Sequence, residues 1–203
     1  MLQPADGRGG TGCAGVTHPW TEKPVKITNI AAAGICLVLS APFAHAAEPM
    51  QPSGVVEAML SNSDKAFFEN AASAGMFEIQ AGKLAQTKAS DAQVKSYAEK
   101  MVSDHTEAAA KLEKLAAAKK VTLPTSLSKH HQMMLDRLNK DSAGADFDAA
   151  YKRQMIVSHK EAVSLFDQES KKGQDADVKA FAAETLPKLQ NHGGMAHDLL
   201  AKS

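Results

Sequence analysis

Cysteine, tryptophan and any excess of one charge are nearly absent from this 203-residue chain. The two cysteines, Cys13 and Cys36, lie near the N-terminus, so the remainder can build neither a disulfide framework nor a thiolate metal cluster. Lysine and arginine number 23 and aspartate and glutamate number 23, which leaves no basic field for a phosphate backbone. We therefore expect no nucleic-acid partner. A hydrophobic content of 44% excludes a wholly disordered chain.

Residues 27–46, ITNIAAAGICLVLSAPFAHA, form an apolar stretch that follows two lysines and ends in Ala44-His45-Ala46. This layout is typical of a secretory signal peptide, so we interpret residues 25–46 as the signal and expect cleavage after Ala46. The alternative is a membrane anchor, but Pro42 and the cleavage pattern count against it. The sequence therefore predicts a periplasmic or cell-envelope protein without a transmembrane segment after cleavage.

The remaining N-terminal residues fall into two parts. Residues 1–24 precede the basic region of the signal, and we interpret them as an over-extended start. Residues 47–62 contain two prolines and a glycine and are expected to form a flexible leader. The folded domain is then expected over residues 63–203.

Helical patterns occupy that domain, and no window shows the alternation of a strand. Ser90 and Gln93 have the spacing of a capping box, and Pro187 should kink or loosen the last helix. We expect an all-α, up-down four-helix bundle with a short extra helix between the second and third long helices. The expected helices span residues 64–89, 91–118, 128–140, 146–172 and 175–201.

Two internal repeats support related helices. Tyr97-x3-Met101-x3-His105-x-Glu107-Ala108 recurs as Tyr151-x3-Met155-x3-His159-x-Glu161-Ala162. The segment starting at Asp91 is likewise matched by the segment starting at Asp175. Because the matched positions share helical spacing, the related helices should present the same face to the core.

Each long helix carries one ionisable residue on its apolar stripe. These are Glu78, His105, His159 and His192, and each lies near the middle of its helix. At 1.5 Å per residue they should fall within about one 5.4 Å turn of one another. Three imidazoles and a carboxylate in one layer suit a divalent metal such as zinc, copper or iron.

The same four residues also have a structural interpretation. A buried histidine is commonly hydrogen-bonded to a carbonyl or carboxylate, and Glu78 with one histidine could form a polar pair that sets helix register. Met101 and Met155 are expected to fill the core, and Tyr97 and Tyr151 to be core residues whose hydroxyls find partners. Other polar side chains are expected on the solvated surface, namely Asp104, Glu107, Glu161 and the pair His130-His131.

Residues 63–200 resemble the DUF4142 family of exported bacterial proteins. The resemblance lies in residues 78–116, the VTLP turn at 121–124, residues 146–166 and VKAFAAETLPKLQNH at 178–192. It implies a ferritin-like four-helix fold and an envelope location, since members are often labelled outer membrane proteins. It implies no established activity.

A ferritin-like fold suggests a di-iron site, which takes a Glu-x-x-His motif from each of two helices. Here Val102, Ile156 and Leu189 stand three residues before the histidines, so the motif is absent. No nucleophile elbow, phosphate loop or HExxH helix occurs either.

The sequence therefore favours a non-catalytic envelope protein that binds one divalent metal ion. It leaves two alternatives open, a structural or interaction module with a hydrogen-bonded polar layer and a metal-dependent enzyme. It does not identify a protein partner or an oligomeric state.

Overall fold

The computed structural model describes residues 60–202, which contain five helices and no strand. The all-α class expected from the sequence is confirmed for these residues. The expected signal peptide and the segment before it lie outside the described residues, as does most of the expected leader. The helices are α1 (Asn62–Lys88), α2 (Ala92–Ala118), α3 (Lys129–Lys140), α4 (Ala145–Lys172) and α5 (Ala176–Ala201).

Side-chain oxygens cap the N-termini of four of the five helices. Ser61, Asp91, Ser128 and Asp175 each accept a hydrogen bond from a backbone N–H in the first turn of the following helix. The expected capping box between Ser90 and Gln93 is wrong, because Asp91 is the cap of α2 and accepts from the Gln93 N–H. The Ser90 hydroxyl instead donates to the carboxylate of Asp148, a stronger acceptor supplied by α4.

Two carboxylates join the ends of helices that are distant in sequence. Asp148, at the start of α4, accepts from the backbone N–H groups of Ser90 and Asp91. Asp64, at the start of α1, accepts from those of Gln174 and Asp175. Hence α2 and α4 start at one end of the structure, and α1 and α5 start at the other.

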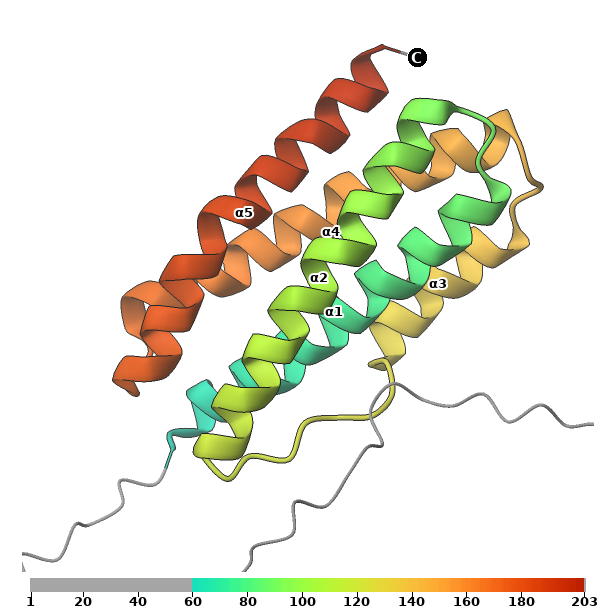
Figure 1. Ribbon diagram of the computed structural model, residues 1–203. Coiled ribbons are helices and arrows are strands. Elements are labelled where there is room, and N and C mark those ends of the chain that lie inside the picture. The colour runs from blue at the N-terminus through green and yellow to red at the C-terminus, as the bar shows by residue number, and fades with distance from the viewer. Residues whose placement is uncertain (1–59, 203) are drawn as a thin grey trace, which may run out of the picture. The chain divides into compact units, whose positions relative to one another are not determined.

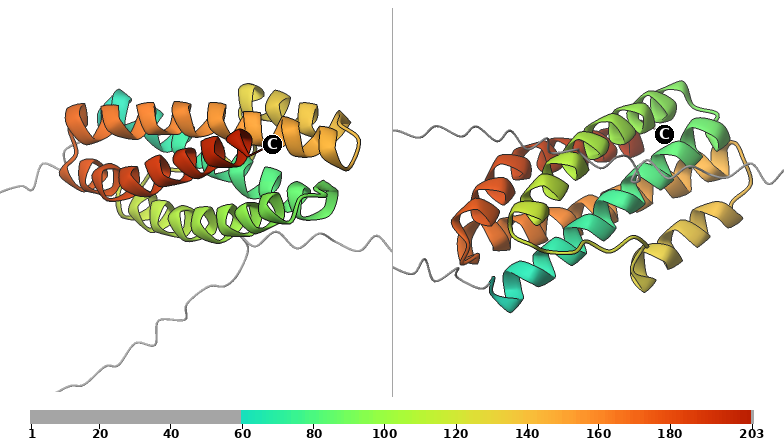
Figure 2. Two further views of the ribbon diagram at one scale, coloured as in Figure 1. Left: turned by 90° about the horizontal axis from the view of Figure 1, so that it is seen from above. Right: turned by 60° about the horizontal axis from the view of Figure 1, so that its bottom comes forward.

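The resulting direction of each long helix can be followed in Figures 1 and 2. The helices α1 and α5 run one way and α2 and α4 run the other. Up-down succession therefore holds within the pairs α1–α2 and α4–α5 but not from α2 to α4. The reason is that α3 and its flanking segments carry the chain back before α4 begins, and α3 packs against α1 and α4.

Two apolar clusters fill the space between the long helices. One includes Phe77, Met101 and Tyr151, and the other includes Phe67, Leu112 and Phe166. Met101 and Met155 are fully buried in the first cluster, so their expected role as core residues is confirmed. On α2, α4 and α5 the three inward histidines lie between these two clusters, so a polar layer separates two apolar cores.

Close approach of α1 to α2 depends on Gly82. A Cβ atom at this position would lie 2.8 Å from Cγ2 of Val102 and 3.1 Å from the carbonyl oxygen of Ala98. A larger residue would therefore force the Val102 side chain to move and press on the Ala98 carbonyl, so glycine favours this close packing of the two helices. Helix α5, by contrast, continues from Ala176 to Ala201 without interruption at Pro187.

Within residues 60–202, none of the helices combines the length and the apolar character needed to span a bilayer.

Candidate metal centre

Three buried histidines from three helices face one another in the polar layer. His105 lies on α2, His159 on α4 and His192 on α5, and all are almost completely buried. Their ring centroids are separated by 5.6, 5.4 and 5.5 Å, which makes a nearly equilateral triangle. One ring nitrogen of each lies within 4.8 Å of those of the other two. We call these three residues the histidine triad.

A carboxylate at the edge of the layer determines the tautomer of His192. Its Nε2 atom lies 2.8 Å from Oδ2 of Asp104. Burial raises the pKa of Asp104, but hydrogen bonds from Lys100 and His192 outweigh it and hold that pKa below its ordinary value. An ionised carboxylate only accepts, so Nε2 of His192 carries the hydrogen and Nδ1 carries the lone pair. The structure leaves that Nδ1 atom buried and without a hydrogen-bond partner.

The tautomer of His159 is set by a backbone carbonyl. Its Nδ1 atom lies 2.9 Å from the carbonyl oxygen of Met155, one turn earlier on α4. Because a carbonyl oxygen is only an acceptor, Nδ1 carries the hydrogen, and in the neutral ring Nε2 carries the lone pair. This Nε2 atom is also buried and unpartnered.

The third imidazole, His105, has a buried Nε2 atom without a partner. Burial lowers the pKa of His105 well below its ordinary value, and the neighbouring His159 and His192 lower it further. Burial likewise lowers the pKa of His192 to about 4, although the bond to Asp104 acts in the opposite direction. Both rings are therefore neutral near pH 7, which is the form that coordinates a metal.

Glu78 of α1 lies beside His159 but does not belong to the group of mutually close ligand atoms. Its Oε1 atom accepts a hydrogen bond from the hydroxyl of Ser158 and lies 3.6 Å from Nδ1 of His159. Its Oε2 atom is buried without a partner. Burial raises the pKa of Glu78, opposed by His159 and by the Ser158 hydroxyl. Glu78 is thus next to the Nδ1 side of His159, while the lone pair of that ring is on Nε2.

Two tyrosines border the layer from the side of the first apolar cluster. The hydroxyl of Tyr97 donates to the backbone carbonyl of His192 at 3.2 Å, as expected for a core tyrosine. Tyr151 is a core residue as expected, but the expected partner is wrong, because its buried hydroxyl has no hydrogen-bond partner. Burial raises the pKa of both hydroxyls, so both are neutral.

Two surface assignments made from the sequence are wrong. Asp104 is 16% exposed and bonds His192, because a residue next to an inward position lies at the edge of the buried stripe. His131 is buried, because α3 packs its ring on Phe77 of α1. Sequence reasoning also missed Ser158, whose position next to His159 could have identified it. The exposed His130 and Glu161 agree with expectation and bond each other.

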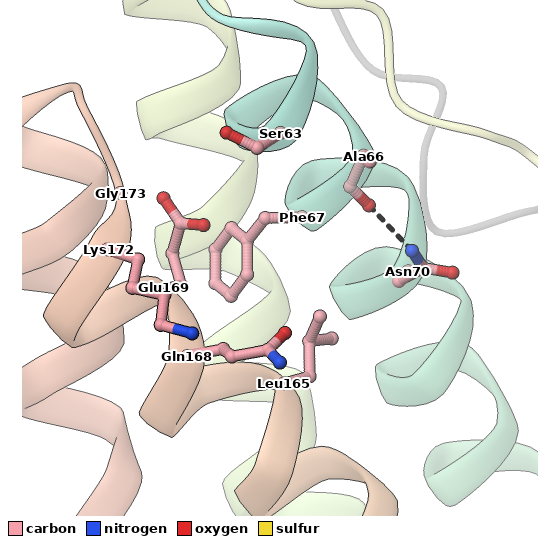
Figure 3. Close-up of a pocket in the computed structure, with 9 residues that line it drawn as sticks. All are labelled: Ser63, Ala66, Phe67, Asn70, Leu165, Gln168, Glu169, Lys172 and Gly173. Carbon is pink, nitrogen blue, oxygen red and sulfur yellow. Dashed lines mark hydrogen bonds between the residues drawn. The ribbon is translucent and has the colours of Figure 1, made fainter.

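A separate carboxyl pair lies at the end of the domain where α1 begins. Glu169 hydrogen-bonds Asp64, and burial raises the pKa of Glu169 to about 7. A pocket of about 400 Å³ lies between α1 and α4 at this end, and Figure 3 shows Glu169 and Phe67 on its lining. None of the triad residues lines this pocket, so it is distinct from the histidine layer.

Comparison with known proteins gives a family and a fold. The family model described as a domain of unknown function, DUF4142, matches residues 49–199. A solved structure described as CopM in the Cu(II)-bound form has a TM-score of 0.58 at 19% identity and covers 68% of this chain and 96% of its own. A DUF305 fragment from Deinococcus radiodurans has a TM-score of 0.62 at 13% identity, covering 71% and 99%.

A conserved hypothetical protein from Mycobacterium tuberculosis, rv2844, has a TM-score of 0.56 at 14% identity, covering 68% of this chain and 91% of its own. No curated protein matches the chain. Identities this low show a shared helical fold and nothing further.

Proposed function

We propose that this chain, which belongs to the DUF4142 family, binds one divalent metal ion in the histidine triad and is a non-catalytic protein of the cell envelope. The observation that carries the proposal is the set of three buried, unpartnered ring nitrogens: Nε2 of His105, Nε2 of His159 and Nδ1 of His192. Buried polar atoms are nearly always hydrogen-bonded, so three such atoms in one layer require an explanation.

Lone pairs distinguish a metal site from a hydrogen-bonded layer. The nitrogens of His159 and His192 are acceptors, because their other nitrogens donate to Met155 and Asp104. The two rings are neighbours with centroids 5.5 Å apart, and two buried acceptors held this close repel unless a cation or a donor lies between them. A bound ion satisfies all three nitrogens at once, and the bonds to Met155 and Asp104 are the outer contacts that orient ligating histidines.

The distances between the ring nitrogens are compatible with coordination of one ion after small side-chain rotations. Three nitrogens each 2.0–2.1 Å from one ion stand about 3.4 Å apart, and one ring nitrogen of each triad histidine already lies within 4.8 Å of those of the other two. Three protein ligands leave a further position, which water or Glu78 could take if its side chain turned. In the present geometry Glu78 is better placed to orient His159.

Imidazole nitrogens without sulfur suit copper(II), zinc and iron. The fold resembles that of a protein solved in a Cu(II)-bound form, which makes Cu(II) the first ion to test, followed by Zn²⁺. For the fold itself we propose a ferritin-like four-helix bundle with α3 in the single long crossover. The signal pattern over residues 27–46 supports export.

Metal titration of variants tests the proposal. The full chain is stripped with a chelator and titrated by calorimetry with Cu(II) and with Zn²⁺. We expect His105→Ala, His159→Ala and His192→Ala each to lose one equivalent. The exposed His197→Ala is the matched control and should keep it.

Only differences between variants are compared, because Cys13 and Cys36 could bind metal elsewhere in the chain. Circular dichroism confirms that each variant is folded. Equal stoichiometry and affinity in all four variants would contradict the metal site. Cell fractionation with N-terminal sequencing tests export, for which the expected first residue is Ala47.

A further inference from the structure

A second group of ligand-type side chains lies at the surface between α3 and α4. His130 and His131 of α3 and Glu161 of α4 each offer a ligand atom within 4.8 Å of those of the other two. We propose that these three residues form a second, solvent-accessible site for a divalent metal ion. This surface site does not depend on the function proposed for the histidine triad.

His131 is the preorganised member of the surface site. Its Nδ1 atom lies 2.7 Å from the hydroxyl of Ser73 and 3.1 Å from that of Ser128. Its ring stacks on Phe77, with centroids 5.6 Å apart and planes inclined by 16°. Because these contacts hold one ring nitrogen and the ring plane, Nε2 is the nitrogen available to a metal, and it needs little reorganisation to bind.

His130 and Glu161 supply the accessible side. Nε2 of His130 lies 3.0 Å from Oε2 of Glu161, and their side chains are 57% and 46% exposed. An ion can therefore reach them without separation of the helices. Two imidazoles and one carboxylate leave positions for water and suit Zn²⁺, Cu(II) or Fe(II).

The position of α3 brings the site together. Adjacent residues of a helix diverge, so His130 and His131 would not share a ligand if α3 stood alone. Here His131 turns toward α1 and His130 toward α4, and their ring centroids are still only 5.3 Å apart. Glu161 comes two residues after His159 on α4, which directs the histidine inward and the glutamate to α3.

The rival interpretation is a simple hydrogen-bonded pair of His130 and Glu161 on the surface. That pair would not involve His131 or the serine that holds it. The two interpretations therefore differ in the effect of changes at His131 and Ser73, which have no role in a surface pair.

The experiment measures Zn²⁺ binding to the full chain by calorimetry, in a His192→Ala background that disables the triad. As before, only differences are compared: this background should bind one equivalent more than the same background with the surface site removed. We expect this equivalent to be lost on adding Glu161→Gln or His131→Ala, and to weaken about tenfold or more on adding Ser73→Ala. It should be unchanged on adding His197→Ala, the control histidine.

A second measurement locates the ion. In the same His192→Ala background, sub-stoichiometric Cu(II) should broaden the backbone amide signals of residues 129–140 in an NMR spectrum before those of α2. Adding Glu161→Gln should remove the effect. Retention of the equivalent in both Glu161→Gln and His131→Ala, or its loss in His197→Ala, would overturn the proposal. Failure of the triad would appear separately, as full wild-type stoichiometry in the His192→Ala background.

Discussion

The carboxylate of Asp104 and the Nε2 atom of His192 are joined by a hydrogen bond of 2.8 Å that links the edge of the buried stripe to the polar layer. The bond leaves the Nδ1 lone pair of His192 on the buried side, where it has no partner. Asp104 also bonds Lys100 and lies 3.8 Å from Lys188, so its charge is balanced without a metal. Asp104 is therefore a positioning residue for the proposed ion.

Replacing Asp104 tests this role. In Asp104→Ala the Nε2–H loses its acceptor and His192 can change tautomer, so metal affinity should fall about 10- to 100-fold. Calorimetric titration with Cu(II) measures the change. Asp167→Ala is the matched control, because Asp167 pairs with Lys171 four residues later on the exposed face of α4. Equal affinity loss in both variants would show a general charge effect.

His105→Leu separates a metal site from a structural polar layer. Without metal, the variant removes a buried nitrogen that has no partner, so the free energy of unfolding should stay the same or rise by about 1 kcal/mol. The increase in melting temperature on adding metal should disappear. Urea denaturation in the presence of a chelator measures the first effect. A loss of about 2 kcal/mol or more would mean that the imidazole stabilises the metal-free fold.

The pair formed by Asp64 and Glu169 should make stability depend on pH. The pKa of Glu169 is about 7 in the folded state against an ordinary value of 4.5. Between these values the folded protein holds a proton that the unfolded chain has released. The contribution of Glu169 is therefore full below 4.5 and is lost as pH rises through about 7, on the order of 1 kcal/mol.

Glu169→Gln isolates this contribution, because the amide can donate to Asp64 at any pH. Buried His105 and His192 produce an opposite slope over part of the same range, since their pKa values are lowered. The histidine slope is common to the wild type and Glu169→Gln, so it cancels when their stabilities are subtracted. Urea denaturation at about pH 5 and about pH 8 should therefore show a larger fall in stability for the wild type. Parallel pH profiles would contradict the shared proton.

Much of the fold could be predicted from helical spacing. The five helices match the expected ranges closely, and the histidines expected to point inward do so. The sequence repeat between the starts of α2 and α5 has a counterpart at the starts of α1 and α4. The same number of residues separates Asp64 from Asp148 as separates Asp91 from Asp175. Asp64 accepts from the turn that precedes α5, and Asp148 accepts from the turn that precedes α2. Two related helical hairpins therefore bond each other's turns.

The candidate site was harder to predict in detail. The stripe residues were found because spacing of four aligns them on one face. Asp104 and Ser158 were missed because each is one position away from the stripe, where a side chain can turn either to solvent or to the layer. His131 was misplaced because an isolated short helix gives no sign of which helix will cover it.

The sequence by itself determined the all-helical class, the polar balance of the chain and the inward position of one ionisable residue on each long helix, because helical periodicity is a local property. Only the tertiary structure decided which of these residues meet. The triad exists because α2, α4 and α5 place their histidines at the same height, and Glu78 stays on the opposite side of His159. Tautomers, burial and the contact between α3 and α4 depend on neighbours far away in the chain, which local spacing does not specify.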